Sequence, residues 1–160
     1  MRPGRSARSV RSRGFTYIAL LALVALISLA LSIAGPTWSD KSRRIHEREL
    51  LRVGALYADA IGAYKADSPG SLKTYPKSLD DLLLDKRFVG VHRHMRQLYP
   101  DPMDPSRPWG VIRDIDGYIV GVFSQDDREP VATGPVSIGD IALPAARHYT
   151  DWKFVPVEPS

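Results

Sequence analysis

Two hydrophobic patterns follow one another along the first 67 residues of the chain. Residues 15–34 (FTYIALLALVALISLALSIA) form a run of twenty positions without a charged residue or a proline. A helix of that length spans about 30 Å, the thickness of the hydrocarbon core of a bilayer. The few polar side chains in the run are hydroxyls, which can bond back to their own helix in lipid. The pattern therefore predicts a transmembrane helix rather than a helix buried in a soluble domain.

The second pattern predicts an amphipathic helix. From Ile45 onward apolar residues recur at spacings of three and four, and charged residues fill the opposite face. The apolar stripe, which we expect to pack in a core, consists of Leu50, Val53, Tyr57, Ile61 and Tyr64. Breakers at Ser68-Pro69-Gly70 predict the end of this helix near Asp67. Since Gly35-Pro36 separates the two patterns, we expect one long helix over residues 15–67 with a hinge at the proline.

A short helix is predicted next. Ser78 can cap a helix over residues 79–84, because Asp81 stands where a capping box places an acid. Residues 87–99 predict either another short helix or a loop. The run 100–105, rich in proline and aspartate, predicts consecutive turns.

A β-hairpin is the clearest strand signal. The dipeptide Asp116-Gly117 is typical of a two-residue type I′ turn, and strand-like residues 109–115 and 118–123 flank it. Such a turn pairs the residues on either side of it and so fixes which side chains face inward. The predicted inward face consists of Trp109, Val111, Ile115, Tyr118, Val120 and Val122.

The rest of the C-terminal part gives weaker signals. Residues 151–157 predict a last short strand, with Trp152 and Phe154 on one face and Pro156 confining it to a sheet edge. Residues 124–150 show weak periodicity and predict a long ordered loop. These elements together predict an α+β fold. A domain over 68–160 is small for an independent core, so we expect the amphipathic helix to supply one wall.

The distribution of charge predicts how the chain is oriented in the membrane and whether it binds nucleic acid. The chain has 160 residues, with 22 Lys and Arg against 18 Asp and Glu and a formal net charge of +4. Five of the arginines lie in residues 1–14, which contain no acidic residue, so the remainder is close to neutral. A nucleic-acid partner is therefore not expected. The basic cluster before the apolar run predicts a cytoplasmic N-terminus and a periplasmic C-terminal part.

Little in the sequence favours catalysis. The absence of cysteine excludes disulfides, thiolate metal sites and a cysteine nucleophile. The chain also lacks a phosphate-binding glycine loop, a nucleophile elbow and a His-Glu-x-x-His motif, so we assign no catalytic residue and expect no enzyme. His92-x-His94 could chelate a metal on a strand, but no third ligand follows at a useful spacing, which favours an exposed basic surface instead.

Three fates of the apolar run are open. A signal anchor would keep it together with everything before it, whereas ordinary signal peptidase would cut after the small residues of Ser32-Ile33-Ala34. A cut after Gly14 would leave the run at the start of the mature chain. The string RSRGFTYIALLALVALISLAL at this junction resembles the class III leader of type IV pilins and type II secretion pseudopilins.

This resemblance implies cleavage after Gly14 by a membrane-embedded prepilin peptidase and N-methylation of Phe15. It also implies a pilin-like fold, in which a long N-terminal helix, half transmembrane and half amphipathic, packs on a small antiparallel sheet. Pro36 is the twenty-second residue counted from Phe15, where many family members carry proline. Ala19 departs from the pattern, because the family usually has glutamate at this fifth position, which pairs with a neighbour's terminal amine during assembly.

A second stretch, AIGAYKADSPGSLKTYPKSLDDLLL, resembles the major pseudopilin and extends the similarity to about residue 85. Major pseudopilins often bind calcium in the loop that follows the hairpin. The resemblance therefore implies Ser124, Asp126 and Asp127 as ligands of Ca²⁺, the one cofactor it suggests. A solvated acidic turn is the alternative, because the loop lacks the usual continuation rich in glycine and aspartate.

These observations divide the chain into a basic leader (1–14), a transmembrane or filament-core helix half (15–36), an amphipathic helix half (37–67) and a small α+β periplasmic domain (68–160). We expect a structural subunit of a type II secretion or type IV pilus machine in the bacterial inner membrane. Its expected partners are the prepilin peptidase, other pseudopilin or pilin subunits and inner-membrane components of the secretion machine. The alternative is a single-pass anchored periplasmic binding or scaffolding domain that does not polymerise.

Overall fold

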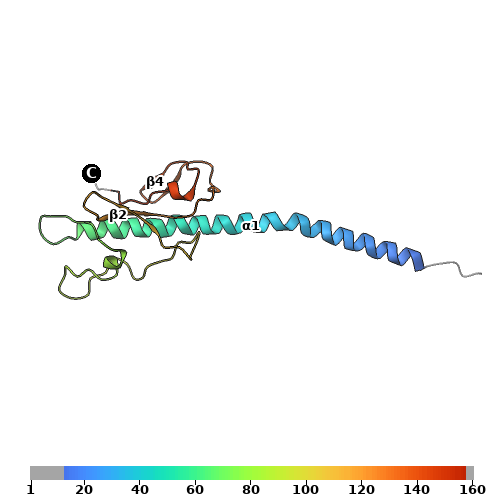
Figure 1. Ribbon diagram of the computed structural model, residues 1–160, viewed down its shortest axis with the longest axis horizontal. Helices are drawn as coiled ribbons and strands as arrows, with labels where there is room; N and C mark the ends of the chain where they lie inside the picture. The colour runs from blue at the N-terminus through green and yellow to red at the C-terminus, as the bar shows by residue number, and fades with distance from the viewer. Residues whose placement is uncertain (1–12, 158–160) are drawn as a thin grey trace, which may run out of the picture. The chain divides into compact units, whose positions relative to one another are not determined.

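One helix, α1, extends from Arg13 to Ala66, and short elements follow it (Figure 1). These elements are two 3₁₀ helices, η1 (Leu79–Leu82) and η2 (Tyr149–Asp151), and four strands, β1 (Gly110–Arg113), β2 (Ile119–Phe123), β3 (Val136–Ile138) and β4 (Ile141–Leu143). The structure is a computed structural model that describes residues 13–157, apart from the side chains of residues 13–16 and 29–40. The predicted α+β class is confirmed.

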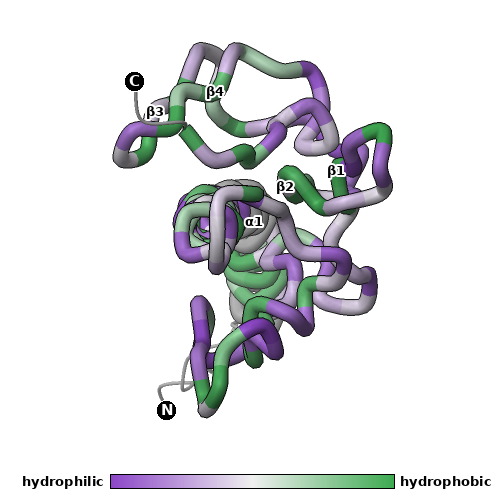
Figure 2. Tube along the Cα trace, turned by 90° about the vertical axis from the view of Figure 1, so that its left-hand side faces the viewer, coloured by the Kyte–Doolittle hydropathy of each residue, from purple (hydrophilic) through white to green (hydrophobic). Residues whose placement is uncertain are grey.

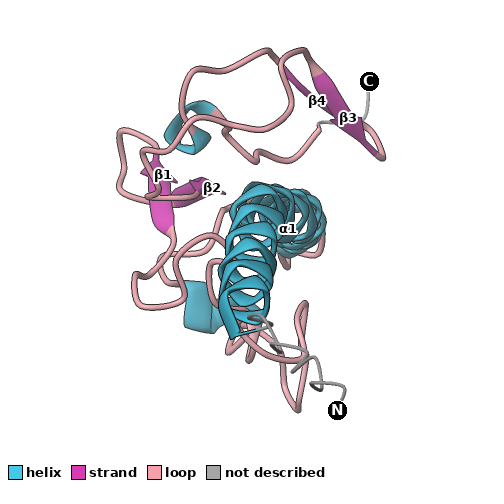
Figure 3. Ribbon diagram, turned by 90° about the vertical axis from the view of Figure 1, so that its right-hand side faces the viewer, coloured by secondary structure: helices cyan, strands magenta, loops and turns pink. Residues whose placement is uncertain are grey.

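The chain divides into two compact units, one up to Lys41 and one from Ser42 onward. The first unit contains the beginning of α1. The second, the globular unit, contains the rest of α1 and all the later elements. Within the globular unit, the β1–β2 pair and the β3–β4 pair lie beside different sides of α1 (Figures 2 and 3).

The part of α1 within the globular unit buries the predicted stripe. Leu50, Val53, Tyr57 and Ile61 are at most 1% exposed, and Tyr64 is 7% exposed. They belong to one hydrophobic cluster with Trp109, Ile119, Val122, Trp152 and Phe154 from the later segments. The predicted core face of the helix is therefore confirmed. Its predicted end is confirmed as well, because α1 stops at Ala66.

A close approach between α1 and the C-terminal segment holds the β1–β2 sheet against the helix. A Cβ atom on Gly54 would lie 2.5 Å from the ring of Phe154, so only glycine permits this contact. Phe154 also exchanges backbone hydrogen bonds with Val122 of β2, at 2.9 and 3.0 Å. Trp152 and Phe154, predicted to share one face, are both fully buried. The segment makes only this single bridge, however, so the predicted strand over 151–157 is wrong.

β1 and β2 form the predicted antiparallel hairpin, but the predicted turn is wrong. Val111 pairs with Val122, the register that a two-residue turn would give, but the register shifts by one residue between Ile112 and Arg113. Asp114 explains the shift, because its carboxylate accepts the N–H of Tyr118 at 2.8 Å and its carbonyl accepts the N–H of Gly117 at 3.1 Å. A longer turn that ends on Gly117, whose φ is +83°, therefore replaces the two-residue type I′ turn, and Val120 is the extra, bulged residue of β2.

The bulge also changes which side chains face inward. Ile115, predicted to be inside, lies in the turn and is fully exposed. Beyond the bulge Ile119 is 1% exposed, whereas Val120, predicted to face inward, is only half-buried. A shift of one residue exchanges the two faces of a strand, which accounts for both corrections.

A second hairpin lies in the stretch that was predicted to be a long loop. β3 pairs antiparallel with β4, with Ile138 opposite Ile141. The two residues between them are Gly139, whose φ is +54°, and Asp140. The prediction of a loop over 124–150 is therefore wrong at this point, because strands of three residues are too short to show a clear alternation.

The short helix η1 has the predicted cap. The hydroxyl of Ser78 accepts the N–H of Asp80 at 3.2 Å, and the carboxylate of Asp81 accepts the N–H of Ser78 at 2.9 Å. The element is a 3₁₀ helix that ends at Leu82, two residues earlier than predicted. Residues 87–99 form a loop, one of the two predicted alternatives, and the run 100–105 consists of turns and irregular backbone as predicted.

Candidate functional site

The first unit exposes large apolar side chains around the whole circumference of α1. Eight such side chains are 51–67% exposed: Tyr17, Ile18, Leu20, Leu21, Leu23, Val24, Leu26 and Ile27. Since a helix completes about three turns over this distance, these side chains point in all directions. The hydroxyl of Ser28 donates to the carbonyl of Val24 at 2.9 Å, as expected for a hydroxyl in an apolar run. Ala19 is part of the same exposed surface.

The other predicted processing and assembly residues, Gly14, Phe15 and Pro36, lie before and after this surface in the sequence. Residues 1–12 of the leader lie outside the described part of the chain. Gly14, Phe15 and Pro36 belong to α1, but their side chains lie outside the described residues, and α1 is helical without interruption through Pro36. Where side chains are described, no helix is both long and apolar enough to cross a membrane. The membrane span therefore remains a prediction.

The predicted calcium ligands do not converge on a common point in the globular unit. Ser124 is buried, and its hydroxyl donates to the carboxylate of Asp101 at 2.6 Å. The carboxylate of Asp126 forms an ion pair with the guanidinium of Arg128 and accepts its hydrogen bonds. The same guanidinium donates to the carbonyl of Met103 at 2.9 Å. A cationic side chain thus stands where the resemblance would place an ion.

The third predicted ligand, Asp127, is held through its backbone. Asp127 is exposed, and its backbone carbonyl lies 2.5 Å from Nδ1 of His148. Burial raises the pKa of Asp126, but its bonds to the Arg128 side chain and N–H outweigh burial and keep the pKa below its usual value. The corner is therefore held by an internal ion pair, and this arrangement favours neither calcium nor the solvated turn that was the alternative.

A buried carboxylate that the sequence analysis missed links α1 to the end of the chain. Glu47 is 7% exposed and accepts the N–H of Val131 at 2.6 Å and the N–H of Ala132 at 3.2 Å. It also accepts the hydroxyl of Tyr149 at 2.8 Å. Burial, together with this carboxylate, raises the pKa of Tyr149 to about 12. In the sequence Glu47 resembles its exposed acidic neighbours, so nothing marked it as a buried group.

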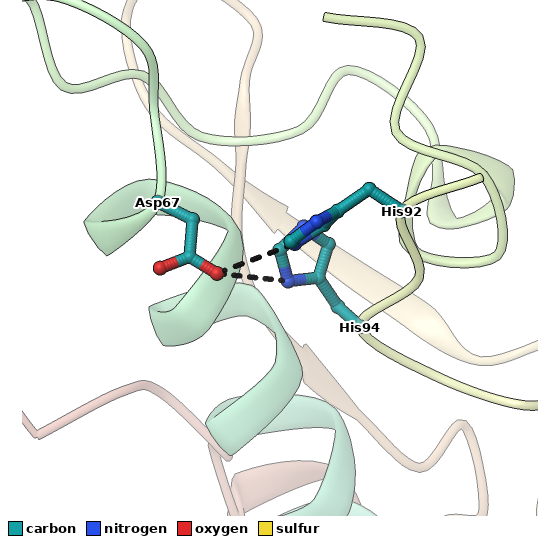
Figure 4. Close-up of side chains that lie close together, drawn as sticks. All are labelled: Asp67, His92 and His94. Atoms are coloured by element: carbon teal, nitrogen blue, oxygen red, sulfur yellow. Dashed lines mark ion pairs between the residues drawn. The ribbon is translucent and has the colours of Figure 1, made fainter. Parts of the chain in front are cut away.

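The two histidines that lacked a third metal ligand in the sequence acquire one in the structure. Asp67, directly after α1, brings its carboxylate to both rings (Figure 4). Nε2 of His92 lies 3.4 Å from Oδ2 of Asp67, and Nδ1 of His94 lies 3.9 Å from the same oxygen. Asp67 was missed because it precedes His92 by 25 positions, and only the packing of the loop against the helix end reveals it.

A second carboxylate lies behind His94. Asp85 is fully buried, and its Oδ2 is 3.2 Å from Nε2 of His94 and 2.6 Å from the guanidinium of Arg87. The bonds to Arg87 hold the pKa of Asp85 well below its usual range, against the effect of burial. The Arg87 guanidinium also lies 3.5 Å from the ring centre of Tyr64 on α1. This pair fixes the loop that carries both histidines.

Comparisons with known proteins found no family model, no curated protein and no solved structure that matches this chain. The functional argument therefore depends on the sequence patterns and on the geometry described above.

Proposed function

We propose that this chain is a structural, pseudopilin-like subunit of a type II secretion or type IV pilus machine, anchored by its N-terminal helix in the bacterial inner membrane. The observation that supports this most is the exposed apolar surface over residues 17–27. Leaving a large apolar side chain in water rather than burying it costs about 1.5–3 kcal/mol, so a surface of eight requires an apolar environment. Lipid, or the helices of neighbouring subunits, provides that environment.

The two parts of α1 have separate tasks in this proposal. The first part stores the subunit in the membrane and later packs among the helices of other subunits. The second part, from Ser42 to Ala66, is covered by the later segments and belongs to the globular unit. In this proposal the globular unit lies in the periplasm. The leader carries five arginines, and their removal by cleavage after Gly14 eliminates charges that would hold the chain to the cytoplasmic face.

Ala19 affects how such a subunit would join a filament. It supplies no carboxylate for the terminal amine of a neighbour, so the contact must come from close packing of small and apolar side chains. Ala19, Ala22 and Ala25 follow one another at a spacing of three on the exposed helix and allow such an approach. This composition favours a special position, such as the filament tip, over the repeated lattice.

The N-terminal sequence of the mature chain tests the proposal. In cells with an active prepilin peptidase, the purified chain should begin at Phe15, with a methylated amine detectable by mass spectrometry. Gly14→Val should retain the leader, because the enzyme would lose the residue it cleaves after. Gly4→Val changes another glycine of the same leader and is the matched control, which should be processed normally.

Two outcomes of this experiment would overturn the proposal. A mature chain that begins at Met1 would indicate an anchored periplasmic domain that does not polymerise. A mature chain that begins at Gly35 would indicate secretion through ordinary signal peptidase.

A further inference from the structure

We propose that Asp67, His92 and His94 bind one divalent transition-metal ion of the Zn²⁺ class. The site lies in the globular unit and does not depend on how the N-terminus is processed, so it goes beyond the proposed function and can fail separately from it. The argument depends on the distances between the ligand atoms, on the groups behind His94 and on the rigidity of the loop.

The distances match a metal centre. The three ligand atoms all lie within 4.8 Å of one another, and the pairs with Asp67 measure 3.4 and 3.9 Å. In a tetrahedral zinc site, bonds of about 2.0–2.2 Å place neighbouring ligand atoms about 3.3–3.6 Å apart. The His92–Asp67 pair already has this spacing. Closing the widest pair requires about 1 Å of movement, which rotation of the exposed His92 ring supplies.

Asp85 determines which nitrogen of His94 faces the site. Nε2 of His94 lies 3.2 Å from Oδ2 of Asp85, which leaves Nδ1 as the ring nitrogen on the side of Asp67. Nδ1 of His94 lies 3.9 Å from Oδ2 of Asp67, too far for a direct hydrogen bond. A cation placed between this nitrogen and the carboxylate is attracted by the carboxylate charge. The carboxylate behind a ligating histidine is also the usual outer partner in protein metal sites.

The backbone around the site is fixed before an ion arrives. The N–H of Asp85 donates to the carbonyl of His92, and the N–H groups of His94 and Met95 both donate to the carbonyl of Leu82, each at 2.9 Å. The ring of His92 stacks on Phe88 with 4.4 Å between centres, and the ring of His94 meets that of Tyr64 edge-on at 5.3 Å. Metal binding therefore requires little ordering of the backbone and of His94, and the movement it needs is confined to the His92 ring.

Exposure and ligand type indicate the class of ion. The side chains of Asp67 and His92 are 49% and 38% exposed, whereas that of His94 is 2% exposed, so an ion can enter from solvent. Two imidazoles and one carboxylate favour Zn²⁺, Ni²⁺ or Cu²⁺ over Ca²⁺ and Mg²⁺, which prefer oxygen ligands. Three protein ligands leave a coordination position open to water. A bound ion would tie the end of α1 to the loop over 85–95.

Zinc titration of the full chain in detergent, freed of metal by a chelator, tests the site. Competition with a chromophoric chelator should show one high-affinity Zn²⁺ per chain. Asp67→Asn and His92→Ala change partly exposed ligands, and each should weaken Zn²⁺ binding by at least about 10-fold. Loss of a group behind a ligand already costs about 10-fold or more, and loss of a direct ligand should cost no less. His148→Ala removes an exposed histidine outside the site and is the matched control, which should bind Zn²⁺ like the unmodified chain.

Ring-nitrogen NMR gives a second measurement that does not depend on affinity. One equivalent of Zn²⁺ should shift the resonances of Nε2 of His92 and Nδ1 of His94 and leave both nitrogens of His46 unchanged. Near-UV circular dichroism should show that Asp67→Asn and His92→Ala retain the packed core. Equal affinity in Asp67→Asn and the unmodified chain, or zinc shifts confined to His46 and His148, would overturn the proposal.

Discussion

The two parts of α1 contain similar apolar residues and present them in opposite ways. Leu21, in the first part, is 51% exposed, whereas Leu50, in the second, is fully buried. Charged residues interrupt the second part at helical intervals and none interrupts residues 15–34. One stripe of apolar side chains can be covered by a single small sheet and its loops, but an all-round apolar surface needs partners on every side. Among the described side chains, the later segments thus cover the stripe of Ser42–Ala66, whereas residues 17–27 remain exposed.

The largest effect on this comparison should come from truncating one leucine in each part. Leu50→Ala should lower the free energy of unfolding of the globular unit by about 2–5 kcal/mol, because it leaves a cavity in the core. Leu21→Ala should leave it unchanged, because Leu21 belongs to the first unit and its side chain is 51% exposed. Denaturant unfolding, followed by the fluorescence of the buried Trp109 and Trp152, measures both changes. Equal losses in the two variants would show that the units do not differ as described.

A smaller effect should follow from changing the buried carboxylate on α1. Glu47→Gln keeps the shape of the side chain, but it removes the charge that the N–H groups of Val131 and Ala132 and the hydroxyl of Tyr149 stabilise. We expect a loss of about 1–3 kcal/mol in the free energy of unfolding.

Glu49→Gln is the matched control for Glu47, because Glu49 lies one half-turn away and pairs with Arg52 at the surface. Its substitution should change stability by no more than about 0.5 kcal/mol. If the two variants unfold at the same denaturant concentration, the buried bonds of Glu47 contribute nothing to the globular unit.

The smallest effect should be the pH dependence between pH 7 and pH 4. Asp85 and Asp126 have a lower pKa in the folded than in the unfolded chain, so they stabilise the fold above the unfolded value and lose this effect as the pH falls. At the unfolded pKa of about 3.9 the loss of stability is still small, and it steepens as the pH falls further.

Circular dichroism separates the two parts of α1 in this acid titration. The near-UV signal of the core should decline below about pH 4, whereas the helix signal of residues 15–34, which contain no titratable carboxylate, should persist. Stability that rises as the pH falls below 4 would contradict the assigned direction of both pKa shifts.

Periodic segments were predictable from the sequence, and contacts between distant segments were not. The stripe of α1, its end near Asp67 and the cap at Ser78 follow from local rules that side chains within a few residues satisfy. The turn of the β1–β2 hairpin was missed because Asp114 bonds to the backbone of Tyr118, a local competition that the dipeptide Asp116-Gly117 does not reveal. Short strands such as β3 and β4 are fixed by pairing rather than by pattern.

The same distinction between local patterns and distant contacts applies to the candidate sites. The His92-x-His94 spacing was visible in the sequence, but Asp67 and Asp85 become neighbours of these rings only when the loop packs on α1. The resemblance to major pseudopilins implied Ser124, Asp126 and Asp127 as ion ligands. Arg128 changes that interpretation, because a neighbouring cation satisfies Asp126 from within the chain.

The bond between Glu47 and Tyr149 joins positions that are 102 residues apart. A unit closed by its first and last segments cannot finish folding until nearly all of it has been synthesised, because the long loop must close before these contacts can form. The contacts of the C-terminal segment would therefore form last, and they would complete the core on α1.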